Sequence, residues 1–150
     1  MNIELRRARA EDAVMLAVIE AQWPTAPGWG KKGISSEIEN PGSCVFVGES
    51  EGKTAGFIAA RFLVPEAEII SIAVERSFVR KGIGRSLLEY LIREAWLRKC
   101  AKVHLDVDVE NKPAIDLYAS AGFKIVGRRP KFYNGTRDAL LMTLESGVRR

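Results

Sequence analysis

Apolar and polar residues alternate strictly over residues 102–109. The apolar positions are Val103, Leu105, Val107 and Val109, and the polar positions between them include His104, Asp106 and Asp108. Successive side chains of a strand point to opposite faces, so this period of two predicts a strand with one buried face. Its other face would present two carboxylates and the single histidine of the chain.

Residues 82–99 follow the period of a helix instead. One row holds Ile83, Leu87, Leu91 and Ala95, with Leu88 and Ile92 beside it. An apolar stripe of this kind predicts an amphipathic helix that packs on a sheet and fixes its own N-terminus at a strand end.

The remaining patterns complete a β-α-α-β-β-β-α-β-α-β-β order. The predicted strands are 2–8, 44–50, 53–64, 67–75, 124–133 and 137–145, and the predicted helices are 10–22, a short one at 35–39, and 111–121 stopped by Gly122. Glu51-Gly52 and Asn134-Gly135 are turn signals that predict hairpins. Residues 23–33, rich in Pro, Gly and Trp, are expected to form a loop. We therefore predict a single mixed α/β domain over residues 1–150.

The composition is that of a soluble globular protein, with 47% hydrophobic and 28% charged residues. No apolar run reaches the about 18 residues that a membrane span needs, and the N-terminus lacks a secretory signal, so we expect a cytoplasmic location. Cys44 and Cys100 have no metal-ligand spacing, and we expect both to be reduced and structural. The net charge of +4 suits an acidic ligand without implying nucleic acid.

The segment Val79 to Arg85 places two glycines and three cations at the start of the long helix. The first N–H groups of a helix have no acceptor inside it, and the helix dipole adds positive charge there. Glycines allow a ligand to approach the backbone closely, so Gly82 and Gly84 favour a phosphate or pyrophosphate site. Arg80, Lys81 and Arg85 would add formal charge. Neither a Walker loop nor a complete G-x-G-x-x-G is present.

Two longer stretches around this segment resemble a known protein family. "AEIISIAVERSFVRKGIGRSLLEYLI" and "VENKPAIDLYASAGF" resemble the GNAT superfamily of acetyl-coenzyme A-dependent N-acetyltransferases, and "RRPKFYNGTRDALLM" completes the pattern. Within it, the chain looks most like ribosomal-protein alanine N-acetyltransferases and archaeal N-terminal acetyltransferases. The resemblance implies a mostly antiparallel mixed sheet flanked by helices, in which a bulge splays the central strands apart into an acyl-coenzyme A cleft.

The resemblance also implies how acetyl-coenzyme A binds, with no metal. The pyrophosphate would meet backbone N–H groups of Arg80, Lys81, Gly82, Ile83, Gly84 and Arg85. The pantetheine arm would pair with the strand that carries Ile72, Ala73 and Val74, and the Asn111 amide would touch the cofactor, although Asn111 can also be only a helix N-cap. One departure is Val79, where the family usually has Gln or Arg. Backbone donors dominate the pyrophosphate contact, so we expect Val79 to weaken cofactor binding only a little.

For the chemistry, Tyr118 matches the family tyrosine beside the thioester sulfur, with a core tyrosine as the alternative. Glu68 occupies the place of the catalytic glutamate of lysine-acetylating members, and Asp106 that of the glutamate of ribosomal-protein enzymes. We expect Glu68 to be the main base, with Asp106 assisting or binding the ammonium; a solvated strand face is the alternative for both. His104 is expected to be a surface residue of its strand.

The acceptor groove would include Trp29, Asp108 and Tyr133. We predict acetyl transfer by direct attack in a ternary complex, and a peptide or protein N-terminal α-amine is the leading acceptor. A small polyamine-like or aminoglycoside amine is the second possibility, and a non-catalytic acyl-coenzyme A-binding module is the third. No nucleic-acid or membrane partner is expected, and the chain would be a monomer or a homodimer.

Overall fold

The computed structural model describes residues 2–26, 28–133 and 135–147. The strands within these ranges are β1 (Glu4–Arg7), β2 (Ser43–Ser50), β3 (Lys53–Leu63), β4 (Glu66–Val74), β5 (Lys102–Asp108), β6 (Lys124–Tyr133) and β7 (Arg137–Glu145). The α-helices are α1 (Ala13–Ala21), α2 (Gly30–Glu39), α3 (Ile83–Leu97) and α4 (Lys112–Ser120). Short 3-10 turns precede α1 and follow β4. The predicted order of elements is confirmed.

The described strands form one seven-stranded sheet in the order β1-β2-β3-β4-β5-β7-β6. Neighbouring strands are antiparallel except β4 and β5, which pair in parallel. Both predicted hairpins join antiparallel strands, β2 to β3 and β6 to β7. The expected α/β class with a mostly antiparallel sheet is confirmed.

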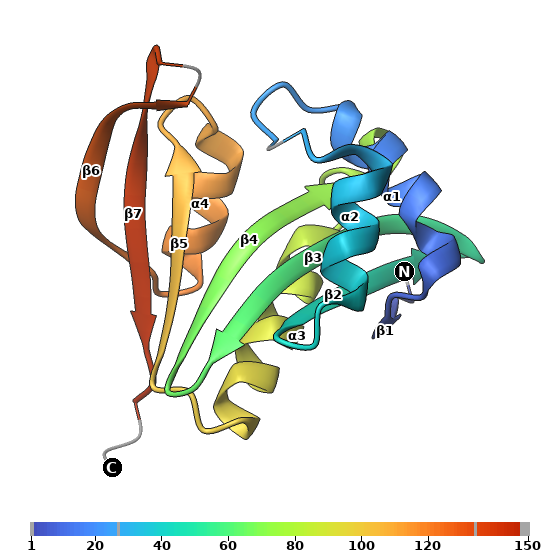
Figure 1. Ribbon diagram of the computed structural model, residues 1–150, viewed down its shortest axis with the longest axis horizontal. Coiled ribbons are helices and arrows are strands. Elements are labelled where there is room, and N and C mark those ends of the chain that lie inside the picture. The colour runs from blue at the N-terminus through green and yellow to red at the C-terminus, as the bar shows by residue number, and fades with distance from the viewer. Residues whose placement is uncertain (1, 27, 134, 148–150) are drawn as a thin grey trace.

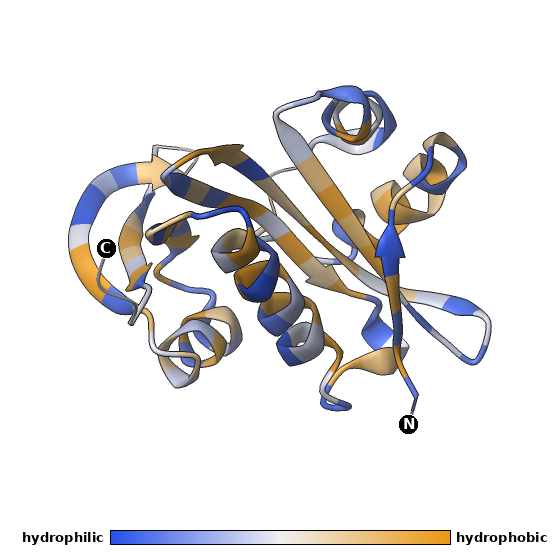
Figure 2. Ribbon diagram, turned by 90° about the horizontal axis from the view of Figure 1, so that it is seen from below, coloured by the Kyte–Doolittle hydropathy of each residue, from blue (hydrophilic) through white to orange (hydrophobic). Residues whose placement is uncertain are grey.

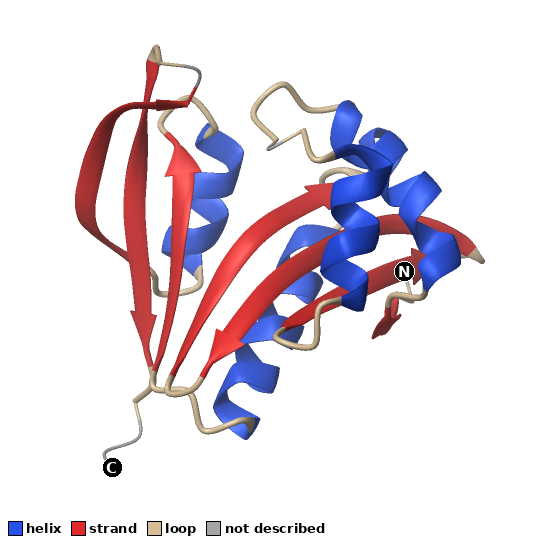
Figure 3. Cartoon of the chain, viewed as in Figure 1, coloured by secondary structure: helices blue, strands red, loops and turns tan. Residues whose placement is uncertain are grey.

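Helices cover both faces of this sheet (Figures 1 and 3). The apolar row of α3 packs with Tyr118 of α4 and with one face of the central strands in the larger core. A second core lies on the other face, where Leu16, Ile19 and Ile34 of α1 and α2 pack against Val47 and Phe57. Figure 2 shows apolar residues along the strands and on the helix sides that face them.

The pairing of β4 changes at Ile70, and this change creates the central opening. The register with β3 runs from Ala60↔Ile69 to Ala59↔Ser71, which leaves Ile70 as a bulged residue. Parallel pairing with β5 ends at Ile69↔Leu105, and the two strands diverge beyond it (Figure 1). A bulge adds local twist and bends its strand. The expectation of a bulge that splays the central strands is confirmed.

Helix α2 differs from the sequence-based expectation. It begins at Gly30, inside the predicted loop, and is longer than the short helix predicted at 35–39. Two glycines lower the intrinsic helix propensity of this segment. Tertiary contacts compensate, because Ile34 is buried in the second core and the buried Glu20 carboxylate accepts a hydrogen bond from Gly30 N–H at 3.2 Å.

Candidate active site

The divergence of β4 from β5 leaves one edge of β4 open. Glu75 N–H donates to Ala55 O on β3 at 2.7 Å. Backbone groups of a strand point alternately to its two sides, so Ala73 faces β3, whereas Ile72 and Val74 direct their N–H and C=O groups to the open edge. A ligand with amide groups could add here as a further strand.

A cleft of about 660 Å³ follows this open edge. Its wall on the β4 side includes Ile70 to Val74, and its opposite wall comes from Val107, Asn111 and the α4 residues Ala114, Leu117 and Tyr118. Arg80 and Gly84 line it at the start of α3, where the sequence predicts phosphate binding. Ile72, Ala73, Val74, Arg80, Gly84 and Asn111 from the predicted cofactor set therefore come together in one cavity.

Backbone geometry at the start of α3 favours a backbone anion site. Gly82 has φ +83°, and a Cβ added there would meet no heavy atom within 4 Å, so the backbone at this position is open to a ligand on that side. Ser86 N–H makes the first helical bond, to Gly82 O at 3.0 Å, which leaves the N–H groups of Ile83, Gly84 and Arg85 without acceptors in the helix. The Ile83 side chain is buried in the core, so only its backbone could serve a ligand.

The three cations predicted at the start of α3 make different contacts. Arg80 lines the cleft. Lys81 Nζ lies 5.7 Å from the centre of the Phe78 ring. Arg85 donates to the Ser120 hydroxyl of α4. Arg80 and Lys81 are exposed and Arg85 bridges to α4, so their positive charge surrounds the helix start.

Tyr118 and Asn111 lie on the α4 side of the cleft. Tyr118 is 5% exposed, and its ring centre is 5.6 Å from that of Phe123. Asn111 is the N-cap of α4, and its side-chain oxygen accepts from Ala114 N–H at 3.3 Å. The cap uses only the oxygen, so the amide NH₂ can still donate toward the cleft, and the two expected roles of Asn111 are compatible.

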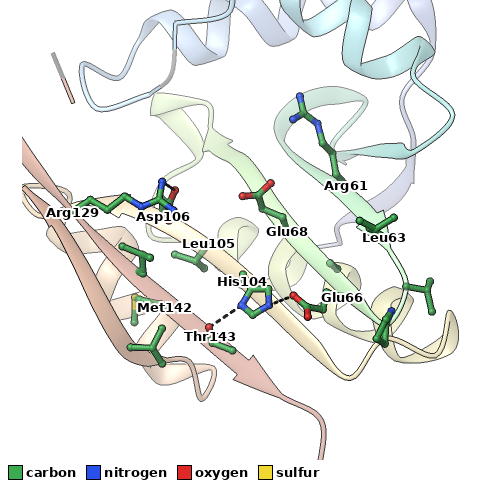
Figure 4. Close-up of a pocket in the computed structure, with 15 residues that line it drawn as sticks. Arg61, Leu63, Glu66, Glu68, His104, Leu105, Asp106, Arg129, Met142 and Thr143 are labelled. Carbon is green, nitrogen blue, oxygen red and sulfur yellow. Dashed lines mark hydrogen bonds and ion pairs between the residues drawn. The ribbon is translucent and has the colours of Figure 1, made fainter. Parts of the chain in front are cut away.

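A second cavity, a groove of about 780 Å³, lies beside the first on the sheet face that carries Glu68 and Asp106 (Figure 4). Asp106 lines both cavities, whereas Glu68 lines only the groove. The Arg129 Nη1 atom is 3.8 Å from Asp106 Oδ2. Glu68 makes no hydrogen bond or close ion pair with the residues that the structure describes, although its charge acts on Arg61, its partner in the strand register. Its carboxylate can therefore still bind water or a cation.

His104 lies on the floor of this groove between Glu66 and Thr143, so side chains from three strands form a row (Figure 4). Its Nε2 lies 2.6 Å from Glu66 Oε1 on β4, and its Nδ1 lies 2.9 Å from Thr143 Oγ1 on β7. His104 is thus a residue of the strand surface, as expected, but Glu66 lies one residue before the strand predicted at 67–75 and was not among the predicted site residues. The alternation of polar and apolar residues from Glu66 to Ile69 is the signal that places Glu66 on the same face as Glu68.

Of the residues predicted for the acceptor groove, Trp29 and Asp108 do not line it, and Asp108 lies instead at the wall of the cleft. The Asp108 carboxylate is 2% exposed and accepts from Arg137 Nε at 2.6 Å and from Glu110 N–H at 2.9 Å; this ion pair raises the pKa of Arg137. Trp29 packs against the core under α1 and α2 and lines neither cavity. The side chain of Tyr133 lies outside the described part of the structure.

Another tryptophan, Trp23, lines the cleft in place of Trp29. Its Nε1 donates to Val74 O at 2.9 Å, and the Arg76 guanidinium lies 5.4 Å from its ring centre. Gln22 fastens the same loop, because its side chain donates to Glu75 at 3.1 Å and accepts from Arg76 N–H at 2.9 Å. Ser77 and Gln22 lower the pKa of the Glu75 carboxyl through these hydrogen bonds. The loop after α1 is thereby held against the end of β4.

Comparisons with known proteins agree with this architecture. The acetyltransferase (GNAT) family model matches residues 14–123. The ribosomal protein bS18-alanine N-acetyltransferase of Escherichia coli K12 is 40% identical over 96 residues, which are 62% of this chain and 65% of that enzyme. An N-alpha-acetyltransferase of Sulfurisphaera tokodaii is 34% identical over 110 residues, covering 65% of this chain and 66% of that protein.

Solved structures give the same result over nearly the whole chain. The crystal structure of the E. coli ribosomal-protein-S18-alanine N-acetyltransferase has a TM-score of 0.90 and 30% identity, and covers 99% of this chain and 97% of that one. A Salmonella typhimurium protein solved with its cofactor acetyl-CoA shares the fold, with a TM-score of 0.84, 21% identity and coverage of 100% and 97%. The chain belongs to the GNAT acetyltransferase family, as its resemblance to that superfamily indicated.

The described residues hold neither a long apolar helix nor a cluster of metal-ligating side chains. No helix among them is long and apolar enough to cross a membrane. They also include no group of three or more His, Cys, Asp or Glu side chains placed to hold a metal ion. Cys44 and Cys100 are both buried, and no disulfide joins them.

Proposed function

We propose that this protein transfers the acetyl group of acetyl-coenzyme A to the α-amine of a peptide or protein N-terminus, by direct attack in a ternary complex. The observation that carries this proposal is the meeting of two cavities at Asp106. The cleft suits an extended cofactor with phosphates at one end, and the groove reaches the same point from the sheet face. The names of the E. coli and Sulfurisphaera relatives favour an α-amine acceptor.

The cleft fits the cofactor in three respects. The open edge of β4 offers Ile72 N–H, Ile72 C=O and Val74 N–H to the pantetheine amides, while Val74 O is used by Trp23. The N–H groups at the start of α3 would hold the pyrophosphate, with Arg80 and Lys81 nearby as counter-charges. Asn111 can donate its amide N–H from the other wall.

Tyr118 would assist the departure of the thiolate. Full proton transfer from a phenol of pKa about 10 to a thiolate of pKa about 8.5 is uphill by roughly 2 kcal/mol. A hydrogen bond that strengthens as sulfur gains charge is therefore the role we assign to the hydroxyl. A backbone N–H on the open edge of β4 would stabilise the thioester oxygen.

Glu68 and Asp106 would together remove the proton of the amine. Asp106 supports this role by its position, because it lines both cavities. Glu68 supports it by availability, because its exposed carboxylate has no ion pair with the described residues. An ordered water between the two carboxylates could pass the proton, and the carboxylates would also attract the ammonium form of the acceptor.

The test is an acceptor panel that follows coenzyme A release with acetyl-coenzyme A in excess. The panel contains a peptide with a free α-amine, the same peptide with that amine formylated and an internal lysine, a polyamine and an aminoglycoside. We expect turnover of the free peptide and loss of turnover on formylation. Turnover of the polyamine or aminoglycoside alone would support the small-amine alternative, and turnover of none would support a non-catalytic module.

A further inference from the structure

We propose that Glu66, held by His104 and Thr143, forms a subsite for a basic side chain at the third residue of the acceptor. This inference rests on the proposed peptide α-amine activity. Its ligand is a lysine or arginine side chain presented by an extended peptide whose N-terminal amine lies at Asp106.

The row of three side chains fixes the Glu66 carboxylate in the groove. His104 Nε2 lies 2.6 Å from Glu66 Oε1, and His104 Nδ1 lies 2.9 Å from Thr143 Oγ1. A carboxylate only accepts, so Nε2–H donates to Glu66, while Nδ1 shares a hydrogen bond with the Thr143 hydroxyl. One oxygen of Glu66 is used and the other is left for a ligand, because the side chain is 55% exposed.

The charges around this row favour a cationic ligand. Glu68 lies beside His104 in the strand register and has no ion pair with the described residues. Two arginines also line the groove. Arg61 is bound by Glu37 and also lies opposite Glu68 in the strand register, where the two charges attract. Arg129 lies at Asp106, 3.8 Å from its carboxylate. Lys102, the strand partner of Glu66, is itself paired with Glu145, with 3.7 Å between Nζ and Oε1. Among the described residues, the carboxylates around Glu66 and Glu68 therefore still outnumber the unpaired cations at the end away from Arg129.

The spacing along β5 selects the third residue of the acceptor. His104 and Asp106 are two positions apart on the same strand face, so they are separated by about 6.6 Å at about 3.3 Å per residue. An extended peptide has the same rise, and its first and third side chains point to the same side. A peptide with its amine at Asp106 that runs along β5 would place its third residue at Glu66 and His104.

The groove walls suit the long stem of a basic side chain. Leu63 and Val64 are 84% and 54% exposed beside Glu66, and Val126 is 65% exposed on the opposite wall. Lysine and arginine cover apolar surface with their methylene groups while the charged head meets a carboxylate. These exposed apolar residues would be covered when such a side chain binds.

The experiment measures kcat/KM for peptides of one length that carry a single arginine at residue two, three or four, together with a peptide that has no arginine and one with glutamate at residue three. We expect kcat/KM for the peptide with arginine at residue three to be about tenfold higher than for the arginine-free peptide. The peptide with glutamate at residue three should have the lowest kcat/KM. Equal values, or a maximum at residue two or four, would overturn the subsite while leaving the acetyltransferase proposal intact. No turnover of any peptide would overturn both.

Charge reversal at Glu66 makes the test independent of simple loss of activity. Glu66→Arg should reverse the order, so that the glutamate peptide becomes better than the arginine peptide. Glu89→Arg is the matched control, since Glu89 is exposed on α3 and the same charge change occurs on the opposite face of the sheet. The proposal is wrong if Glu66→Arg keeps the preference for arginine, or if Glu89→Arg changes it equally.

Discussion

Tyr118 is the residue whose position bears most directly on the leaving group. It is buried at the cleft wall, where its ring packs against Phe123. Tyr118→Phe keeps this ring contact and removes only the hydroxyl, so we expect kcat to fall by roughly 10²-fold, as for loss of a positioned acid. Calorimetry should show acetyl-coenzyme A affinity within about twofold of the unaltered protein. An unchanged kcat would assign Tyr118 to the core alone.

The two groove carboxylates can be separated by their effects on the pH–rate profile. A peptide α-amine of pKa about 7.7–8.0 is already roughly one-third neutral near pH 7.5, whereas a lysine of pKa about 10.4 is neutral only about once in a thousand. An α-amine enzyme therefore tolerates a base that acts through water. We expect both Glu68→Gln and Asp106→Asn to lower kcat/KM and to shift its acidic limb.

The relative size of these two effects identifies the main base. The sequence setting and the longer side chain favour Glu68, and the position at both cavities favours Asp106. Loss of the acidic limb in only one variant assigns the base to that residue. Unchanged profiles in both variants would mean that a water held by the backbone is sufficient.

At the scale of the element, the start of α3 can be tested with one substitution. Gly82→Glu would place a carboxylate beside the N–H groups that we assign to the pyrophosphate. We expect acetyl-coenzyme A binding, measured by calorimetry, to weaken by at least tenfold because the like charges repel and the side chain occupies the site.

A matched control separates this repulsion from backbone strain. Gly52, in the turn between β2 and β3, has φ +75° against +83° for Gly82, and neither has a heavy atom within 4 Å of an added Cβ. Gly52→Glu should therefore impose a similar conformational cost while leaving affinity unchanged. Equal affinity of folded Gly82→Glu and Gly52→Glu would contradict the phosphate site.

The elements that could be predicted from the sequence are those whose information is local. Strict alternation in β5 and the helical row of α3 fix which faces are buried, and the bounds of β6 and β7 match the predicted strands. Helix α2 could not be placed correctly, because Gly30 and Gly33 oppose a helix and the compensating contact comes from Glu20 on another element.

The same dependence on distant contacts explains why the sequence predicts Trp29 for the site, whereas Trp23 lines the cleft. Nothing local distinguishes Trp23 from Trp29, which lie in one Pro- and Gly-rich stretch. The choice depends on the hydrogen bond from Trp23 to Val74 on β4, 51 residues away in the sequence. Asp108 was likewise assigned to a ligand because its partner, Arg137, is 29 residues away along the chain.

Across the whole molecule, the bulge at Ile70 links the cofactor and acceptor sides. Before it, Ala67 and Ile69 face the larger core, so Glu66 and Glu68 face the groove. After it, Ala73 belongs to the second core, and Ile72 packs against the larger one. One extra residue therefore reverses the two faces of β4, and the same strand supplies carboxylates to the groove and backbone groups to the cleft.

Low pH should weaken the packing of α1, the helix that leads into the Trp23 loop. Arg6 donates to both carboxylate oxygens of Asp12 at 2.8 Å, beside the start of α1. This hydrogen bonding lowers the pKa of Asp12 below its usual value. A carboxyl whose pKa is lower in the folded state contributes stability above its unfolded pKa of about 3.9, and that contribution is lost as the pH falls through the folded value.

Asp12→Asn should therefore destabilise the protein most at neutral pH and least in acid. We expect a loss of about 2 kcal/mol near pH 7, the scale of a hydrogen bond to a charged group, and a smaller difference from the unaltered protein at pH 3. Thermal unfolding followed by circular dichroism from pH 3 to 7 measures both. Asp116→Asn, at an exposed position of α4 with no ion pair among the described residues, should follow the unaltered protein throughout. A constant difference between Asp12→Asn and the unaltered protein at every pH would show that the ionised form of Asp12 is not what stabilises the packing of α1.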